Sequence, residues 1–356
     1  MKAWRLRMAE GSLELEDVPE PQLRPGSVIV RVDAALVVGY LREYAAGELT
    51  SYNPPPGTFT PGTSGLGVIE DIGPDVYSLR RGQRVLLTGH YTSAENVPEP
   101  AQALLGITAS PESVPVLETW RDGTFAEQVV VPVSTVTPVP EELAGFDSGV
   151  LAAATRCLVP YGGFVRGRLQ PGETVVVNGA TGGFGSAGVH VARAMGARTV
   201  IAAGRNARAL ARLAALDRVT TVPLTGDVAA DADALRRAAG GPVDMALDMI
   251  GGAATPYSTQ AVLDSLGREG RLVLMGSMTA PLPIDYTALM MTGREIIGNF
   301  MYRADAPARL LALVAAGLLD LTAIPISHRP LAELPAAMDE ATAPDAPLVV
   351  VGGAGR

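Results

Sequence analysis

The chain has 356 residues but a single cysteine, Cys157, and only three histidines. One cysteine cannot close a disulfide within the chain, so a secreted scaffold held together by disulfides is excluded. No window approaches the roughly 18 uninterrupted apolar residues of a membrane span. The first residues show no apolar core followed by a small-residue cleavage site, as a signal peptide would. These absences predict a soluble protein of the cytoplasm.

Basic residues are outnumbered: 28 Lys and Arg against 37 Asp and Glu give a formal net charge of −9. Nucleic acids and anionic membranes both bind to basic faces, so neither is expected as a main partner. With 47% hydrophobic and 18% charged residues, the composition is that of a globular protein. The length suits two domains, since domains usually run about 100–200 residues.

Residues 1–145 are expected to be mostly strand. Short β-branched segments bounded by glycine and proline lie at 28–32, 67–73, 84–87 and 125–132. Strands at this spacing suggest a small barrel or sandwich. Residues 90–118 have no clear period and are rich in Pro, Glu and Ser, so they are expected to form a surface excursion.

The pattern of apolar residues changes near residue 172. Helical stretches alternate with short, unbroken apolar strands at 174–177, 198–203, 219–222, 243–247 and 271–275. This pattern predicts a parallel sheet covered on both faces, the doubly wound α/β fold.

The chain after residue 304 is too short for a third domain, so we expect it to return and complete the first one. Helices are expected at 307–316 and 331–341, a strand-like piece at 323–326 and a strand at 348–351.

A glycine-rich turn follows the strand at 174–177 and precedes a helix, which is the context of a dinucleotide-binding fingerprint. Its glycines are spaced G-x-x-G-x-x-G instead of the standard G-x-G-x-x-G. The first would permit the tight turn, the second the approach of a diphosphate, and the third close helix packing. The helix N-terminus would offer free N–H groups to the diphosphate. The predicted cofactor residues here are Gly179, Ala180, Thr181, Gly182, Gly183, Phe184 and Gly185.

The next strand, 198–203, is followed by Gly204, Arg205 and Asn206, with Arg208 one helical step beyond. Folds that bind NAD usually place an acidic side chain about 20 residues past the glycine loop to hold the ribose hydroxyls. Here Arg205 stands in its place, and a guanidinium suits a 2′-phosphate. The sequence therefore predicts NADPH as cofactor. The alternative is a solvated arginine at a helix start.

With these pieces assembled, the chain resembles the medium-chain dehydrogenase/reductase superfamily, and within it the zinc-free, quinone-oxidoreductase-like branch. The resemblance covers essentially the whole chain, because the matching pieces occur in order at 25–26, 61–69, 82–85, 123–127, 179–185, 244–248 and 270–276.

The resemblance implies a GroES-like, mainly β catalytic domain, residues 1–145 and 305–356, around a Rossmann domain, residues 146–304. It implies a cleft between them that holds the nicotinamide near Gly276 and Ser277. It also implies a homodimer formed through the edge of the Rossmann sheet, with 294–300 as an edge strand.

Zinc-dependent members of this superfamily carry a catalytic Cys, a Gly-His-Glu triplet and a third ligand. This chain has Val37-Val38-Gly39, Gly62-Thr63-Ser64 and Ala154-Thr155 at the corresponding places. Tetrahedral zinc needs thiolate, imidazole or carboxylate ligands, so we expect no metal. Cys157 is interpreted as a small core residue.

Without a metal to stabilise an alkoxide, substrates that delocalise negative charge themselves are favoured. We expect hydride transfer from NADPH to a quinone or an α,β-unsaturated carbonyl, a small-molecule substrate. The anion formed needs a proton donor. Tyr40, Tyr44 and Tyr52 are candidates. Tyr52 leads because 47–56 resembles a substrate loop of related reductases, and Tyr40 is second. The alternative for Tyr52 is a loop tyrosine stacked on the prolines at 54–56 without a catalytic role. Water or a ribose hydroxyl could serve instead.

Two other functions stay open at this point. One is a zinc-free, NADP-dependent alcohol dehydrogenase or ketoreductase. The other is a non-catalytic protein that binds NADPH.

Overall fold

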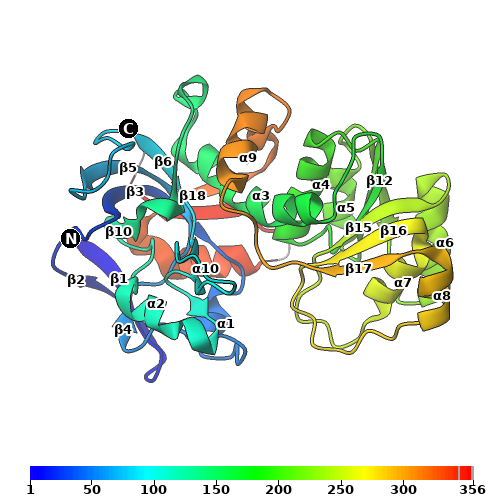
Figure 1. The fold of residues 1–356 in the computed structure, drawn as a ribbon, viewed down its shortest axis with the longest axis horizontal. Helices are drawn as coiled ribbons and strands as arrows, with labels where there is room; N and C mark the ends of the chain where they lie inside the picture. The colour runs from blue at the N-terminus through cyan, green and yellow to red at the C-terminus, as the bar shows by residue number, and fades with distance from the viewer. Residues whose placement is uncertain (344, 354–356) are drawn as a thin grey trace. The chain divides into compact units, whose positions relative to one another are not determined.

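The computed structural model describes residues 1–343 and 345–353. They form two compact units (Figure 1). The first contains residues 1–155 and the chain from 321 onward, and the second contains residues 156–320. Both boundaries fall later in the chain than the 145/146 and 304/305 boundaries expected from the sequence. The α3 helix (Ser148–Arg166) runs across the first boundary, and α9 (Ala306–Ala315) belongs to the second unit.

A seven-stranded sheet organises the first unit, in the order β11-β6-β5-β3-β19-β18, with β10 also paired to β3. Its longest strand, β3 (Ser27–Val37), has a nearly continuous run of buried residues. The C-terminal strand β19 (Leu348–Gly352) pairs antiparallel with β3, so the end of the chain completes this unit. The other elements of the sheet are β5 (Gly65–Ile72), β6 (Arg84–Leu87), β10 (Gln128–Pro132), β11 (Val136–Pro138) and β18 (Ile326–Pro330).

The predicted excursion at 90–118 has structure of its own. It contains a three-stranded antiparallel sheet and a short helix, and Leu105 and Leu117 are buried in a small separate hydrophobic cluster. Its elements are β7 (His90–Thr92), β8 (Gln102–Leu104), β9 (Thr108–Ala109) and α2 (Val114–Thr119). The remaining elements of the unit are β1 (Lys2–Arg7), β2 (Ser12–Asp17), α1 (Leu41–Ala45), β4 (Thr58–Phe59) and α10 (Leu334–Thr342).

The second unit contains a six-stranded sheet in which every pairing is parallel, in the order β14-β13-β12-β15-β16-β17. In chain order this is 3-2-1-4-5-6, the order of a Rossmann sheet, and the doubly wound prediction is confirmed. The strands are β12 (Thr174–Asn178), β13 (Thr199–Gly204), β14 (Val219–Pro223), β15 (Val243–Asp248), β16 (Leu266–Leu274) and β17 (Glu295–Gly298).

Helices cover both faces of this sheet. Right-handed crossovers place α4 (Gly183–Ala194) and α5 (Ala207–Leu213) on one face, and α6 (Val228–Ala239) and α7 (Tyr257–Ser265) on the other. Contacts between α6 and α7 agree with this arrangement. The strand order reverses between β12 and β15, so their carboxyl ends border the crevice where such folds bind ligands. Helix α8 (Tyr286–Thr292) precedes the edge strand β17.

One predicted element was wrong, and one observed element was not predicted. The piece at 323–326 is not a strand: Leu321–Ala323 is a turn of 3₁₀ helix, and β18 begins only at Ile326. The long helix α3 was not expected, because Pro160 and a Gly-Gly pair lie inside it. In the part of the chain that the structure describes, no helix combines the length and the apolar character needed to cross a membrane.

Candidate functional site

The glycine loop, residues 179–185, follows β12 and includes the first residues of α4. Gly179 has φ +77°, a conformation that favours glycine. Its carbonyl accepts a 3.0 Å hydrogen bond from the N–H of Gly182, which closes the turn, and Gly182 is the N-cap of α4. Both Gly182 and Gly183 are exposed. The first N–H groups of a helix have no partner within it, so they are available to an anion.

Gly185 sets how closely α4 approaches the loop. A Cβ built on Gly185 would overlap the carbonyl oxygen of Gly179 and would lie 2.9 Å from the Cα of Ala180. Both obstacles are backbone and cannot turn away. The third glycine is therefore required for close helix packing, the role expected for it.

The other predicted cofactor residues of β13 lie beside this loop. The N–H of Ala180 donates to the carbonyl of Ala203 at 3.0 Å. A Cβ on Gly204 would come within 2.6 Å of the Thr181 side chain, so Gly204 leaves room for Thr181. The structure therefore brings 179–185 and 204–206 together.

Arg205 and Asn206, which follow β13, have different roles. The side-chain oxygen of Asn206 accepts from the N–H groups of Arg208 and Ala209, at 3.0 and 3.1 Å, and caps α5. Arg205 is exposed. Within the described residues its side chain has no hydrogen bond or ion pair. Its guanidinium is therefore available to a ligand.

Asp248 ends β15 at the same edge of the sheet and is buried. Its carboxylate accepts hydrogen bonds from Thr259 Oγ1 (2.7 Å), Asn178 Nδ2 (3.1 Å) and the N–H of Ile250 (3.1 Å). Burial raises the pKa of Asp248, and these hydrogen bonds act in the opposite direction. Because Asn178 ends β12, the carboxylate ties the ends of the two strands that border the crevice.

Gly276 and Ser277 follow β16 and lie against the loop after β15. A Cβ on Gly276 would overlap the carbonyl oxygen of Ile250, and a Cβ on Gly251 would come 3.2 Å from the Ser277 hydroxyl. Both predicted residues are exposed and lie at the carboxyl edge of the sheet.

One residue at this edge was missed by sequence reasoning. Arg156, on α3, places its guanidinium 4.7 Å from the ring centroid of Phe184 in the glycine loop. No spacing rule marks Arg156, because the contact is made between residues that lie far apart in the sequence.

In the first unit, Tyr40, Tyr44 and Tyr52 form a tyrosine cluster. The ring centroids of Tyr40 and Tyr52 are 6.1 Å apart, and those of Tyr44 and Tyr52 are 5.8 Å apart. Tyr44 is buried and donates its hydroxyl hydrogen to the carbonyl of Ile107 at 2.6 Å. Tyr44 therefore has a structural role and is removed from the candidate proton donors.

Tyr52 lies on a loop that the excursion holds in place. The N–H of Asn53 donates to Thr108 Oγ1 at 2.9 Å, and its side-chain amide donates to the carbonyl of Ala109 at 3.0 Å. Burial raises the pKa of Tyr52, and a hydrogen bond with Tyr40 acts in the opposite direction. The phenol is thus protonated at neutral pH and able to donate.

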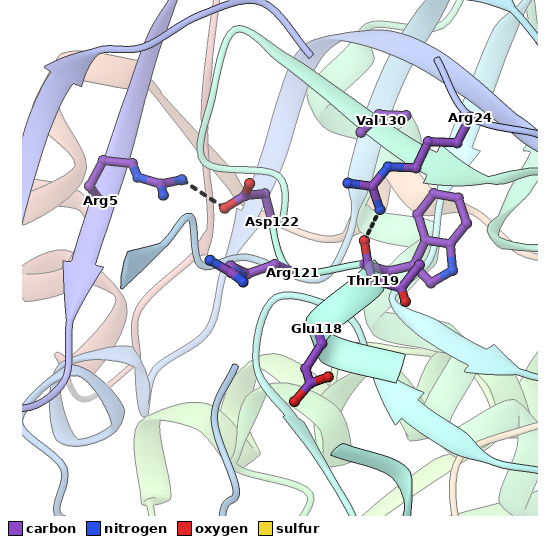
Figure 2. A pocket seen from close by; sticks show the side chains of 8 residues that line it. Arg5, Arg24, Glu118, Thr119, Arg121, Asp122 and Val130 are labelled. Carbon is purple, nitrogen blue, oxygen red and sulfur yellow. Dashed lines mark hydrogen bonds and ion pairs between the residues drawn. The ribbon is translucent and has the colours of Figure 1, made fainter. Parts of the chain in front are cut away.

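The first unit contains a pocket of about 290 Å³, and Figure 2 shows the side chains that line it. Arg5 forms a 2.7 Å ion pair with Asp122, and Arg24 donates to the carbonyl of Thr119 and lies 5.5 Å from the Trp120 ring. A pocket for an apolar acceptor is expected to be mostly hydrophobic. This one is lined mostly by charged and polar side chains and includes none of the three tyrosines: Arg5, Arg24, Glu118, Thr119, Trp120, Arg121, Asp122 and Val130.

The residues at two of the three expected zinc-ligand positions do not fit a zinc ion. Val37 and Val38 offer no ligand atoms, Ala154 is apolar, and the Thr155 hydroxyl donates to the carbonyl of Ala152 at 2.7 Å. Among the described residues there is no group of three His, Cys, Asp or Glu side chains that could hold a metal.

Two other titratable groups are buried in the second unit. Burial lowers the pKa of His190 to about 4, with a smaller contribution from Arg193 that Asp320 opposes. Burial raises the pKa of Cys157 to about 12. At neutral pH both are uncharged, and both fill the interior of the unit.

Two family models match the chain: "Alcohol dehydrogenase GroES-like domain" over residues 24–141 and "Zinc-binding dehydrogenase" over residues 183–316. The first match confirms the predicted GroES-like domain. An L-threonine 3-dehydrogenase of Anaeromyxobacter dehalogenans is 27% identical over 335 residues, which cover 91% of this chain and 90% of the relative.

Solved structures share the fold over nearly the full chain. The alcohol dehydrogenase TADH from Thermus sp. ATN1 has a TM-score of 0.82 and 23% identity, with 99% of both chains covered. A zinc-binding dehydrogenase from Sinorhizobium meliloti 1021, solved with NADP, has a TM-score of 0.80 and 23% identity, with 98% of both chains covered.

Proposed function

We propose that this chain, which belongs to the medium-chain dehydrogenase/reductase superfamily, is a metal-independent, NADPH-dependent reductase. Its substrate would be a quinone or an α,β-unsaturated carbonyl compound. The observation that carries the proposal is the exposed guanidinium of Arg205 at the end of β13, beside the glycine loop.

The choice of NADPH rests on charge. An acidic side chain at this place would hold the ribose hydroxyls of NADH and repel a 2′-phosphate. Arg205 has the opposite sign and offers a planar set of donors that matches phosphate. Arg208, exposed on the first turn of α5, adds a second positive charge nearby.

Replacing Arg205 with Ala tests this assignment. We expect the KM for NADPH to rise about tenfold or more, because hydrogen bonds to charged groups contribute roughly 1.5–3 kcal/mol. The KM for NADH should change little. Equal changes for both coenzymes would show that Arg205 does not recognise the 2′-phosphate.

The substrate class follows from the missing zinc ligands. A Lewis acid stabilises the alkoxide formed from a simple ketone, and the side chains at the ligand positions cannot hold one. A quinone or an enone delocalises the negative charge itself. The bound coenzyme supplies a hydride, and the acceptor then takes a proton from a donor of the protein or solvent.

We propose Tyr52 as that donor, with Tyr40 as its hydrogen-bonding neighbour. The phenol of Tyr52 is protonated at neutral pH, since burial raises its pKa. Tyr44 cannot take this role, because the Ile107 carbonyl already holds its hydroxyl.

A second candidate is a zinc-free, NADP-dependent alcohol dehydrogenase or ketoreductase; the names of two relatives, an L-threonine 3-dehydrogenase and an alcohol dehydrogenase, favour the dehydrogenase part of this candidate. Coenzyme turnover should be measured with quinones, enones, aldehydes and alcohols, with and without a chelator. Turnover of alcohols alone would support this second candidate, and loss of activity with chelator would contradict metal independence. Tight NADPH binding without turnover of any acceptor would indicate a non-catalytic binding protein.

We also propose that the chain forms a homodimer through the second unit. Strand β17 is the last in the sheet order. Large apolar side chains near it in the sequence are exposed: Ile284, Tyr286, Met290, Met291 and Phe300. A sheet edge beside such side chains is a surface that a second copy can cover. Light scattering of the wild-type chain and of a Met290→Glu, Met291→Glu variant would test this: a dimer and a monomer are expected, respectively.

A further inference from the structure

The side chain of Arg156 meets the glycine loop at Gly183. A Cβ built on Gly183 would overlap Nη1 of Arg156. The same guanidinium lies 4.7 Å from the Phe184 ring centroid. Gly183 and Phe184 are the first two residues of α4, so the guanidinium lies against the N-terminal turn of that helix.

The packing of α3 on α4 explains why Arg156 reaches this point. Residues 156 and 160 lie one turn apart on α3, as residues 184 and 188 do on α4. At the second of these turns, a Cβ on Gly188 would lie 3.3 Å from Pro160. The two helices thus face each other along this line, and Arg156 is aimed at the start of α4.

The Arg156 guanidinium places a positive charge at the N-terminus of α4. The N-terminus of a helix carries a partial positive charge, which favours anions and disfavours a cation. The first turn of α4 contains no acidic residue. The guanidinium and the first N–H groups of α4 therefore lie at the same exposed turn, and an anion bound there would interact favourably with both.

We propose that Arg156 binds the diphosphate of the coenzyme together with the N–H groups at the start of α4. The proposal rests on the proposed coenzyme function. It adds a second arginine with a task different from that of Arg205: Arg156 contributes to every coenzyme that has a diphosphate, whereas Arg205 selects the 2′-phosphate. It also explains why residue 183 is glycine, because any side chain at 183 would displace the guanidinium.

The test compares two arginine variants against three probes. NADH, NADPH and adenosine 2′-monophosphate are titrated calorimetrically into the wild-type chain, Arg156→Met and Arg205→Ala. Arg156→Met should weaken NADH and NADPH by the same factor, about 10–100-fold, and leave the 2′-monophosphate unchanged. Arg205→Ala should weaken NADPH and the 2′-monophosphate and spare NADH. Arg166→Met, at the exposed far end of α3, is the matched control and should bind like the wild type.

A second set of variants protects the test against loss of folding. In Gly183→Ala the new methyl group meets only the far end of a flexible side chain, so the fold is retained and the guanidinium is displaced. This variant should weaken NADH about as much as Arg156→Met does. In an Arg156→Ala background, Gly183→Ala should have little further effect. Arg156→Lys, which keeps the charge, should recover part of the affinity.

The failures of the two proposals are distinguishable. If the wild type binds coenzyme and Arg156→Met binds NADH equally well, the role of Arg156 is overturned and the coenzyme function stands. Additive effects of Gly183→Ala and Arg156→Ala would overturn it as well. If the wild type binds neither coenzyme, the proposed function itself is wrong.

Discussion

Seven consecutive residues make the glycine loop of the second unit, whereas the tyrosine cluster of the first unit draws on segments near residues 40, 52 and 107. The loop works through backbone: an overlap with a carbonyl oxygen explains why residue 185 is glycine. The cluster works through side chains, since Tyr44 and Asn53 are held by carbonyls of the excursion. A site of the first kind is local, and one of the second kind depends on tertiary structure.

This difference predicts how each site responds to substitution. A methyl group added to the loop should act directly on coenzyme binding. A change in the excursion should act on the cluster at a distance, through the bonds at Ile107 and Ala109. The two compact units make this testable, because hydrogen exchange of backbone amides can assign each effect to one unit.

The largest effect is expected from removing the Tyr52 hydroxyl. Positioned general acids contribute about 10²–10⁴-fold to turnover, so Tyr52→Phe should lower kcat by a factor in that range. The KM for NADPH should stay unchanged, because the glycine loop is intact. Steady-state kinetics with the best quinone or enone acceptor would measure both constants. An unaltered kcat would assign proton delivery to water or to the ribose.

The next largest effect is expected in the glycine loop. Gly185→Ala places a methyl group against the carbonyl of Gly179 and the Cα of Ala180, neither of which can turn away. Overpacking of this kind costs about 1–3 kcal/mol of stability, and a displaced helix start should abolish coenzyme binding. Chemical denaturation and coenzyme titration would measure the two effects. Gly145→Ala, where the added methyl meets nothing within 4 Å, is the control.

A pH-dependent effect should distinguish the two units. Burial holds the pKa of His190, on α4, at about 4, whereas the unfolded chain takes up this proton near pH 6.5. The unfolded state therefore binds more protons between these values, and stability falls as the pH drops from about 6.5 to about 4. The full loss is on the order of 3 kcal/mol.

Unfolding at several pH values would measure this slope. His190→Asn should remove this pH dependence of stability, and replacing exposed His328 in the first unit should leave it in place. A slope that persists in His190→Asn would show that another group causes it.

The sequence predicted the features that depend on consecutive residues and did not predict those that depend on tertiary contacts. The glycine loop was found because its glycines are consecutive with a strand and a helix, and Arg205 because it follows the next strand. The parallel sheet was found because its strands are buried on both faces and are continuously apolar. All of these signals are local.

The features that the sequence did not predict depend on contacts between segments that lie far apart in the chain. Arg156 lies on a helix that Pro160, Gly162 and Gly163 conceal from propensity arguments, and its partner Phe184 is far along the chain. The excursion at 90–118 has no period because its strands have only two or three residues. Its function as a support for the tyrosines depends on single hydrogen bonds, which no sequence pattern encodes.

The smallest effect is expected from a substitution at Tyr44, whose hydroxyl is held by the excursion at 90–118. Tyr44→Phe leaves the ring in place and removes only the hydrogen bond to the Ile107 carbonyl, which is then buried without this donor. Such a loss costs about 1–3 kcal/mol of stability, and amide hydrogen exchange should show it in the first unit alone. Tyr77→Phe, at a tyrosine that is 90% exposed, should change nothing. Because Tyr44 packs beside Tyr52, kcat should fall by a smaller factor than in Tyr52→Phe, and coenzyme affinity should be unchanged. If Tyr44→Phe instead weakened coenzyme binding as much as Gly185→Ala, the loop and the cluster would act as one site, and the contrast between a local site and a tertiary one would fail.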